Sequence, residues 1–347
     1  MNLPAASVQV ENAVLVTADG LRHQELFFGA DEELIKDKKS GIETPDALRE
    51  QFWRSDAADR RRALLPFFWS TLAAGGSIFG NRARGSRVNV SNAYRVSYPG
   101  YAEILTGQAQ PSITENKAVP NPHETILEFV RRKLKVGPMQ VAAFGSWSLF
   151  RHITAHQPGA IFSNSGYEPI PHDIATPLMD TLSNLQQRAR TPWDTVRHDA
   201  VTAGLALEHL ASYRPRLLYL ALGETDDWAH NRRYDRVLQS IRLFDDILRE
   251  LWTSLQSMDD YRDRTALIIT TDHGRGRTSS DWSDHGAKIS GADEIWIALI
   301  APGVEGRGEA SNFPALYQNQ VAATLLQLLG LDDREFNPSS GKPIPLG

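Results

Sequence analysis

The feature that most constrains the fold is a set of five short apolar runs in which polar residues do not alternate with apolar ones. The runs are Ala13–Asp19, Gln140–Gly145, Arg216–Gly223, Thr265–Asp272 and Ile295–Ala301. Such uninterrupted runs are typical of parallel strands buried on both faces. Helical apolar stripes are found in Glu124–Leu134, Asp194–Ser212, Tyr234–Ser257 and Asn319–Leu329. Strands separated by helices predict an α/β fold with a parallel central sheet.

Two stretches, 22–90 and 147–192, do not follow this alternation of strands and helices. The first contains a charged segment and a Gly-rich segment, and the second is rich in Pro, His and Asn. We interpret both as loop or cap insertions laid over the sheet. The chain has 347 residues, a length that a single large domain accommodates. We therefore predict one domain, 1–347, with these two insertions within it.

Composition excludes several kinds of protein. The formal net charge of −5 argues against a general nucleic-acid-binding surface. Because the chain has no Cys, it forms no disulfide, and a bound metal would need carboxylate, imidazole or hydroxyl ligands. No apolar run is long enough to span a membrane. The first twelve residues lack the features of a signal peptide. An exported protein without its signal would look the same, so the compartment is open, as is the oligomeric state.

Carboxylates follow three of the predicted strands. Asp19 ends the first strand, Asp226 comes three residues after the third, and Asp272 ends the fourth with His273 next to it. Taken singly, an Asp after a strand is usually a turn residue or a helix N-cap. In an open α/β sheet, however, ligands bind at the carboxyl ends of the strands. Three such ends together predict a binding site at that edge.

Histidines near these carboxylates indicate metal binding. Asp226 and His230 are four residues apart, so on a helix both side chains point the same way, although Asp227 is an alternative to Asp226. His285 lies in a second Asp-His-Gly sequence, where an exposed loop histidine is the alternative interpretation. Zn²⁺ accepts carboxylate and imidazole ligands together, and Mn²⁺ tolerates the same mixture.

Ser97 is the candidate nucleophile. It stands in the sequence Ser-Tyr-Pro, just before a predicted short helix over Tyr101–Thr106 that Gly107 ends. The free N–H groups and dipole of a helix N-terminus stabilise an anion there, such as a phosphoryl group. The alternative is that Ser97 is only an N-cap.

These motifs, taken in order, resemble the alkaline phosphatase superfamily, on the side of type I phosphodiesterases, nucleotide pyrophosphatases and sulfatase-like enzymes. The motifs are ADG at 18–20, SYPGYAEILTG at 97–107, TDDWAH at 225–230, TTDHG at 270–274, DHG at 284–286 and VAATLLQLLG at 321–330. Each fragment is weak by itself, and the ordered set is specific. The resemblance implies a single alkaline phosphatase-like catalytic domain with a three-layer α/β/α fold and a mostly parallel central sheet.

The resemblance also assigns residues to two divalent metals, with Zn²⁺ favoured and Mn²⁺ as the alternative. It groups Asp19, Ser97, Asp272 and His273 around one metal, and Asp226, His230 and His285 around the other. Ser97 matches the nucleophilic Thr or Ser of the family. Asn116 matches an Asn that hydrogen-bonds a phosphoryl oxygen, with Asn121 as a competitor. From their place beside the ligands in sequence, Arg275 and Lys288 are weaker candidates for substrate binding.

Two positions depart from the family patterns, and the first argues against a sulfatase. Sulfatases carry an Arg two residues after the Pro of their nucleophile motif, and Tyr101 stands there in this chain. The family Gly between the metal-binding Asp and His is Ala229, a small change that should not move the ligands. The resemblance thus implies a metal-dependent phosphoric ester hydrolase, a phosphatase or phosphodiesterase, that acts on a small phosphate ester through a phosphoseryl intermediate on Ser97.

Two other activities are alternatives. One is a phosphotransferase similar to the cofactor-independent phosphoglycerate mutases, which usually carry a large inserted domain between the nucleophile and the later ligands. The roughly 120 residues between Ser97 and Asp226 are few for such a domain. The other is a non-catalytic protein that binds metal or an anion, which the presence of Ser97 disfavours.

Overall fold

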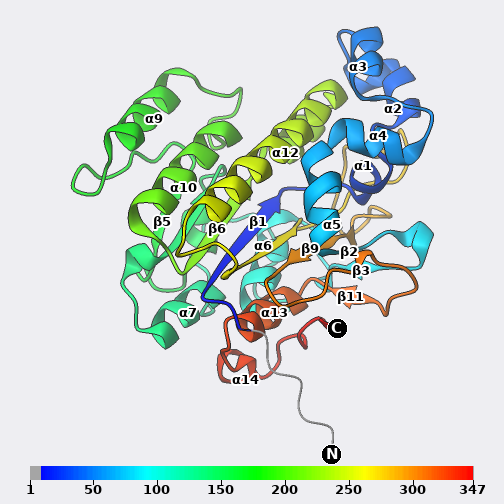
Figure 1. The fold of residues 1–347 in the computed structure, drawn as a ribbon. Coiled ribbons are helices and arrows are strands. Elements are labelled where there is room, and N and C mark those ends of the chain that lie inside the picture. Colours follow the sequence, from blue (N-terminus) through cyan, green and yellow to red (C-terminus); the bar gives the residue numbers. More distant parts are fainter. Residues whose placement is uncertain (1–8, 347) are drawn as a thin grey trace, which may run out of the picture.

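A central eight-stranded sheet forms the middle of the molecule (Figure 1). The computed structural model describes residues 9–346, so residues 1–8, which include most of the segment compared with a signal peptide, lie outside the described residues. The strand order is β10-β2-β9-β7-β1-β6-β4-β5. The strands are β1 (Asn12–Ala18), β2 (Ser77–Phe79), β4 (Val141–Gly145), β5 (Phe162–Ser165), β6 (Leu217–Leu222), β7 (Thr265–Thr270), β9 (Ile297–Ile300) and β10 (Gly308–Glu309). A smaller sheet contains β11 (Leu316–Tyr317), β3 (Val88–Asn89) and β8 (Glu294–Ile295).

The middle of the large sheet is parallel, as predicted. β1 pairs in parallel with both β6 and β7, and β4 pairs in parallel with β6 and β5. Ala18 is opposite Leu222, and Thr17 is opposite Thr270, so β1, β6 and β7 end at nearly the same level. The chain therefore leaves all three strands at one edge of the sheet.

The prediction that Ile295–Ala301 is a parallel strand was wrong. This run divides into β8 and β9, and β9 pairs antiparallel with β7 and with β2. β7 ends at Thr270, and the next strands begin only at Glu294, with no helix in the connection between them. Without a crossover helix the chain re-enters the sheet from the edge where it left, so the strand runs backwards.

Helices cover both faces of the sheet and complete the predicted three-layer α/β/α fold (Figure 1). One core includes Val14, Val16 and Leu220 with residues of α10 and α12, and the other includes Ala13, Leu15 and residues of α6, α7 and α13. The helices are α1 (His23–Phe28), α2 (Glu32–Lys36), α3 (Pro45–Phe52), α4 (Ala57–Leu64), α5 (Ala73–Gly75), α6 (Ser97–Thr106), α7 (Ile126–Leu134), α8 (Phe150–Ile153), α9 (Pro177–Arg188), α10 (Asp199–Tyr213), α11 (Glu224–His230), α12 (Tyr234–Ser257), α13 (Gln320–Leu328) and α14 (Asp333–Phe336). Among residues 9–346, no helix combines the length and the apolar character that crossing a membrane requires.

The two stretches interpreted as insertions over the sheet, 22–90 and 147–192, contain helices outside the sheet, but each also contributes a strand to it. Helices α1 to α4 of the first stretch gather beside α12 (Figure 1). β2, however, lies between β10 and β9 in the central sheet, and β5 forms an edge of that sheet beside β4. β2 has only three residues, and β5 reads Phe-Ser-Asn-Ser. Neither has the long apolar run by which β1, β4, β6 and β7 were recognised.

Helix α6 is buried along its whole length and packs against the end of β7. All ten of its residues are buried, and Gly107 ends the helix with a φ of 74°. A Cβ atom at Gly100 would lie 2.3 Å from the main-chain oxygen of Asp272. Gly100 therefore allows the first turn of α6 to approach the segment that follows β7.

We predict that Gly100→Ala lowers the free energy of unfolding by about 1–3 kcal/mol, because the methyl group must displace α6 or the Asp272 main chain. Urea denaturation of the variant and the wild type measures this change. Gly137→Ala is the matched control, because Gly137 has a φ of −70° and nothing within 4 Å of an added Cβ. Equal stability of the Gly100 variant and the wild type would contradict the close contact.

Candidate functional site

The first group of predicted ligands meets around His273, at the edge where β1, β6 and β7 end. His273 Nε2 lies 3.4 Å from Asp19 Oδ1, 3.4 Å from Asp272 Oδ2 and 3.7 Å from Asp226 Oδ1. Asp19 directly follows β1, Asp272 follows β7 after one residue, and Asp226 lies in the first turn of α11, which begins two residues after β6. The common level at which the three strands end thus brings three carboxylates to one imidazole.

The second group adjoins the first. His230 Nε2 lies 3.1 Å from Asp226 Oδ2 and 3.0 Å from His285 Nε2. The rings of His273 and His285 are stacked, with their centroids 3.9 Å apart. Asp226 and Asp227 are the two carboxylates of α11 that could contact His230, and the structure shows that Asp226 does so. All seven residues predicted as ligands are brought into one cluster.

Ser97 lies at the start of α6 with its hydroxyl directed at this cluster. Ser97 Oγ is 3.4 Å from His273 Nε2, and the residue is 4% exposed. Val96, and not Ser97, occupies the N-cap position, so the alternative that Ser97 is only an N-cap was wrong. In the described part of the chain, the Ser97 N–H has no hydrogen-bond partner, and it remains available to an anion.

The two asparagines considered for phosphoryl contact have different environments. Asn116 is exposed, and its Oδ1 accepts a hydrogen bond of 2.8 Å from the Tyr98 N–H, next to Ser97. Asn121 is buried, where its amide group donates to Ile153 O and accepts from the His123 N–H. Asn121 is therefore committed to the protein's own main chain, whereas Asn116 lies beside the nucleophile with its Nδ2 free of protein acceptors among residues 9–346.

Arg275 is not placed as a substrate ligand would be. It is 2% exposed, and its guanidinium donates to Asp226 Oδ1, to Asp226 O and to Ser283 O. The expectation that Arg275 binds substrate was therefore wrong, because its buried guanidinium neutralises the Asp226 carboxylate. Arg275 thereby links α11 to the segment that carries His285. Lys288 is exposed, with no ion pair or hydrogen bond to any residue of the described range.

Tyr101 contacts the ligand cluster, which was not predicted from the sequence. Its buried hydroxyl donates to Asp19 Oδ2 at 2.9 Å. Burial and the charges of Asp19 and Asp272 raise the pKa of Tyr101 well above its usual value, so the hydroxyl stays protonated and remains a donor. The signal was present in the sequence, because Tyr101 follows Ser97 by four residues and thus lies one helical turn further along the same face.

The carboxylates and His273 shift one another's pKa values. Burial and the charge of Asp19 raise the pKa of Asp272 to about 8. Burial alone would lower the pKa of His273, but Asp272 and Asp19 raise it to about 9. Asp19 Oδ1 and Asp272 Oδ2 are buried and have no hydrogen-bond partner. Buried carboxylate oxygens without partners are costly unless a cation lies between them.

Burial and the positive charges of His273 and Arg275 keep the pKa of His285 far below its usual range. Burial also lowers the pKa of His230, as does His273. Both imidazoles are therefore neutral, the form in which histidine binds a metal. Two sets of three ligand atoms lie close enough to hold a cation: Asp19, Asp272 and His273, and Asp226, His273 and His285.

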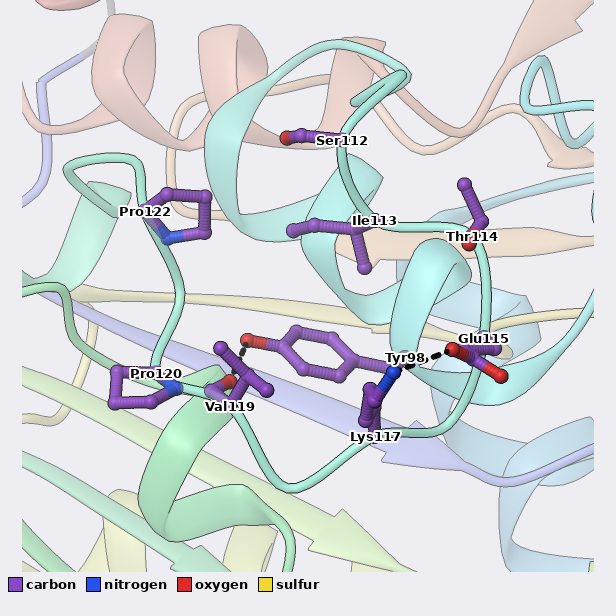
Figure 2. Close-up of a pocket in the computed structure, with 9 residues that line it drawn as sticks. All are labelled: Tyr98, Ser112, Ile113, Thr114, Glu115, Lys117, Val119, Pro120 and Pro122. Atoms are coloured by element: carbon purple, nitrogen blue, oxygen red, sulfur yellow. Dashed lines mark hydrogen bonds and ion pairs between the residues drawn. The ribbon is translucent and has the colours of Figure 1, made fainter.

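A cavity of about 320 Å³ adjoins the site through Tyr98 (Figure 2). The segment Ser112–Pro122 surrounds the Tyr98 ring, and the Tyr98 hydroxyl donates to Val119 O at 2.9 Å. None of the seven predicted ligands lines this cavity. It is therefore a neighbour of the ligand cluster and not part of it.

Comparison with known folds agrees with this architecture. A phosphonate monoester hydrolase of Agrobacterium radiobacter has a TM-score of 0.54 at 16% identity, over 92% of this chain and 74% of that chain. The lipoteichoic acid synthase LtaP of Listeria monocytogenes has a TM-score of 0.57 at 11% identity, over 94% and 73%. An alkaline phosphatase superfamily protein of Vibrio parahaemolyticus has a TM-score of 0.56 at 14% identity, over 94% and 68%. At these identities the likeness concerns the fold alone.

Sequence comparison gives the family. No curated protein matches the chain. The model of the type I phosphodiesterase / nucleotide pyrophosphatase family matches residues 48–325. This range is most of the chain, and it includes every predicted ligand from Ser97 to His285. The chain therefore belongs to the type I phosphodiesterase / nucleotide pyrophosphatase family and is a homologue of the hydrolases of the alkaline phosphatase superfamily.

Proposed function

We propose that the protein hydrolyses a small phosphate ester through a phosphoseryl intermediate on Ser97, with two divalent cations in the site. The observation that carries this proposal is the position of Ser97 Oγ at a helix start, 3.4 Å from an imidazole that also adjoins three carboxylates. This arrangement combines a nucleophile, an anion-binding main chain and a cation-binding cluster at one point.

The residues present fit two cations. Asp19, Ser97, Asp272 and His273 would hold one, and Asp226, His230 and His285 would hold the other. The buried, unpartnered oxygens of Asp19 and Asp272 support the first site. Neutral His230 and His285 around Asp226 support the second. Carboxylates with imidazoles suit Zn²⁺, and Mn²⁺ is the alternative. When bound, such a pair of cations neutralises charge on the attacking and leaving oxygens.

The chemical step uses groups of this chain. Ser97 Oγ forms a bond to phosphorus while the bond from phosphorus to the ester oxygen breaks, and the proton lost by Ser97 leaves on that oxygen as an alcohol. Water then cleaves the Oγ–phosphorus bond, which releases the phosphate product and restores Ser97. The Ser97 N–H and the Asn116 amide are the donors for the phosphoryl oxygens, and Asn116 is held for this purpose by its bond to the Tyr98 N–H.

The surroundings of Ser97 favour a diester over a monoester. A monoester dianion carries more charge than a diester, and a cationic side chain free to bind it would be needed. Arg275 is engaged with Asp226 and Ser283, and the Arg95 guanidinium lies 3.6 Å from Asp293. Lys288 is exposed, and within the described residues it forms no hydrogen bond or ion pair with Ser97 or the ligand cluster. Family membership among type I phosphodiesterases supports the same preference. Hydrolysis rates for an aryl phosphate diester and the matching monoester test it.

The two alternative activities have less support. The segment between Ser97 and Asp226 contributes β4, β5, β6 and their covering helices to the main fold, which leaves little chain for the inserted domain of a mutase. A purely binding protein would not require a serine hydroxyl beside the ligand cluster. Transfer of phosphate to an alcohol with no release into water would favour the mutase alternative.

Removal of metal tests the cations. We predict that dialysis against a chelator abolishes hydrolysis of an aryl phosphate diester, and that Zn²⁺ or Mn²⁺ restores it, because Ser97 then lacks its counter-charges. Elemental analysis confirms that the sample is metal-free, and circular dichroism confirms that it is folded. Full activity of a folded, metal-free sample would overturn the proposal.

Substitution of Ser97 tests the nucleophile. We predict that Ser97→Ala lowers turnover by several orders of magnitude with little change in melting temperature, because among the described residues the hydroxyl contacts only His273 and caps no helix. Ser97→Thr should keep a measurable fraction of activity, since Thr retains a hydroxyl. Ser257→Ala, at the exposed end of α12, is the control that should match the wild type. Normal turnover by the Ser97→Ala variant would mean that the nucleophile is another group.

A further inference from the structure

We infer that Glu103, which is none of the proposed ligands, is a positioning residue that fixes His285 by holding the segment Ser91–Arg95. This inference rests on the proposed function, since it concerns one of the two proposed cation sites. It extends that function by naming a buried carboxylate on which the site depends. A chain of contacts, each visible in the structure, connects Glu103 to His285.

The first contact is between Glu103 and the main chain. Glu103 lies on α6 and is fully buried. Oε1 accepts from Ser91 N at 2.9 Å and from Ser91 Oγ at 2.7 Å, while Oε2 accepts from Asn92 N at 2.8 Å and from Asn92 Nδ2 at 2.9 Å. In the described range no Lys or Arg forms an ion pair with it. A buried carboxylate without a counter-ion depends on such hydrogen bonds, so Glu103 binds this segment tightly.

The next contact is made by Asn92 itself. Its Oδ1 accepts from Tyr94 N at 3.1 Å and from Arg95 N at 2.9 Å. Arg95 has a φ of 54°, in the left-handed region that costs free energy for a residue with a side chain. Such a conformation persists only where its surroundings impose it. Asn92 is held by Glu103 and in turn holds Arg95 in this conformation.

The last contact reaches the site. Arg95 O lies 3.2 Å from His285 Nδ1, so the Nδ1–H of His285 donates to it. A neutral imidazole with its proton on Nδ1 presents a lone pair on Nε2. Nε2 is the atom that faces His230 Nε2 at 3.0 Å and Asp226 Oδ1 at 3.9 Å. The Arg95 carbonyl therefore fixes both the tautomer and the direction of His285, and Glu103 fixes the carbonyl.

Glu103 and Ser97 belong to the same helix. Residues 91–96 form a loop whose first part is bound by Glu103 and whose end continues directly into Ser97. Because α6 is buried against the end of β7, this loop is anchored to a rigid element. The contacts from Glu103 through Asn92 and Arg95 thus connect helix α6, which carries Ser97, to His285. These two parts of the site are nearly two hundred residues apart in sequence.

The inference is tested by calorimetric titration of protein that a chelator has freed of metal. Zn²⁺ and Mn²⁺ are titrated separately. Glu103→Gln keeps the shape of the side chain but turns an amide N–H₂ toward donors. We expect one of the two binding steps to weaken about 10–100-fold, the usual effect of losing a contact that orients a ligand, while the other step is unchanged. Loss of kcat for an aryl phosphate diester should accompany the weaker step.

Glu128→Gln is the matched control. Glu128 is a buried glutamate on α7 that accepts from Thr125 N at 2.9 Å, His156 N at 2.8 Å and Gln157 N at 2.8 Å, and none of its partners is a proposed ligand. It should lower the melting temperature while both metal-binding steps keep the wild-type affinity. The comparison separates positioning from a general loss of stability.

Asn92→Ala gives a second test if Glu103→Gln does not fold. It removes the acceptor for the Tyr94 and Arg95 N–H groups and keeps the Glu103 carboxylate, and the same binding step should weaken. Two wild-type binding steps in either folded variant would overturn the inference. If the wild-type protein itself binds neither Zn²⁺ nor Mn²⁺, it is the proposed function that fails.

Discussion

The convergence of three buried carboxylates on one imidazole is the constraint on which the rest of the site depends. Asp19, Asp226 and Asp272 meet within reach of one imidazole because β1, β6 and β7 are adjacent, parallel and end at one level. Burial, and after it the neighbouring charge of Asp19, raise the pKa of Asp272 to about 8. Burying these carboxylates costs free energy, and bound cations at this edge of the sheet would offset it.

The surrounding protein donates to one oxygen of each carboxylate from outside the cluster. Tyr101 donates to Asp19 Oδ2, the Gly20 N–H donates to Asp272 Oδ1 at 3.0 Å, and Arg275 donates to Asp226 Oδ1. The other oxygens of Asp19 and Asp272 face His273 and have no hydrogen-bond partner, whereas both oxygens of Asp226 lie near histidines of the cluster. This division orients the carboxylates before any ligand arrives. This arrangement supports the proposed cation site, in which Arg275 holds Asp226.

Family and site together narrow the chemistry within a fold that many activities share. The structures that share this fold include a lipoteichoic acid synthase and a phosphonate monoester hydrolase, so the fold alone does not choose a reaction. The particular residues do more. Tyr101 stands where a sulfatase carries Arg, and it supports Asp19 instead. The proposal of a phosphodiester as substrate follows from the absence of a free guanidinium beside Ser97 in the described residues.

The parallel strands β1, β4, β6 and β7, the helices α7, α10, α12 and α13, and the convergence of Asp19, Asp226 and Asp272 could be predicted from the amino-acid sequence, whereas helix α9 could not. Local sequence patterns are sufficient to predict these features, because apolar runs and helical stripes indicate which side chains are buried. The direction of β9, the strand character of β2 and β5, and the choice of Asn116 beside Ser97 emerged only from the folded chain. So did the pairing of Arg275 with Asp226 and the link from Glu103 to His285 through Arg95. Each of these depends on which distant segments meet, and neither hydropathy nor spacing along the chain records such contacts.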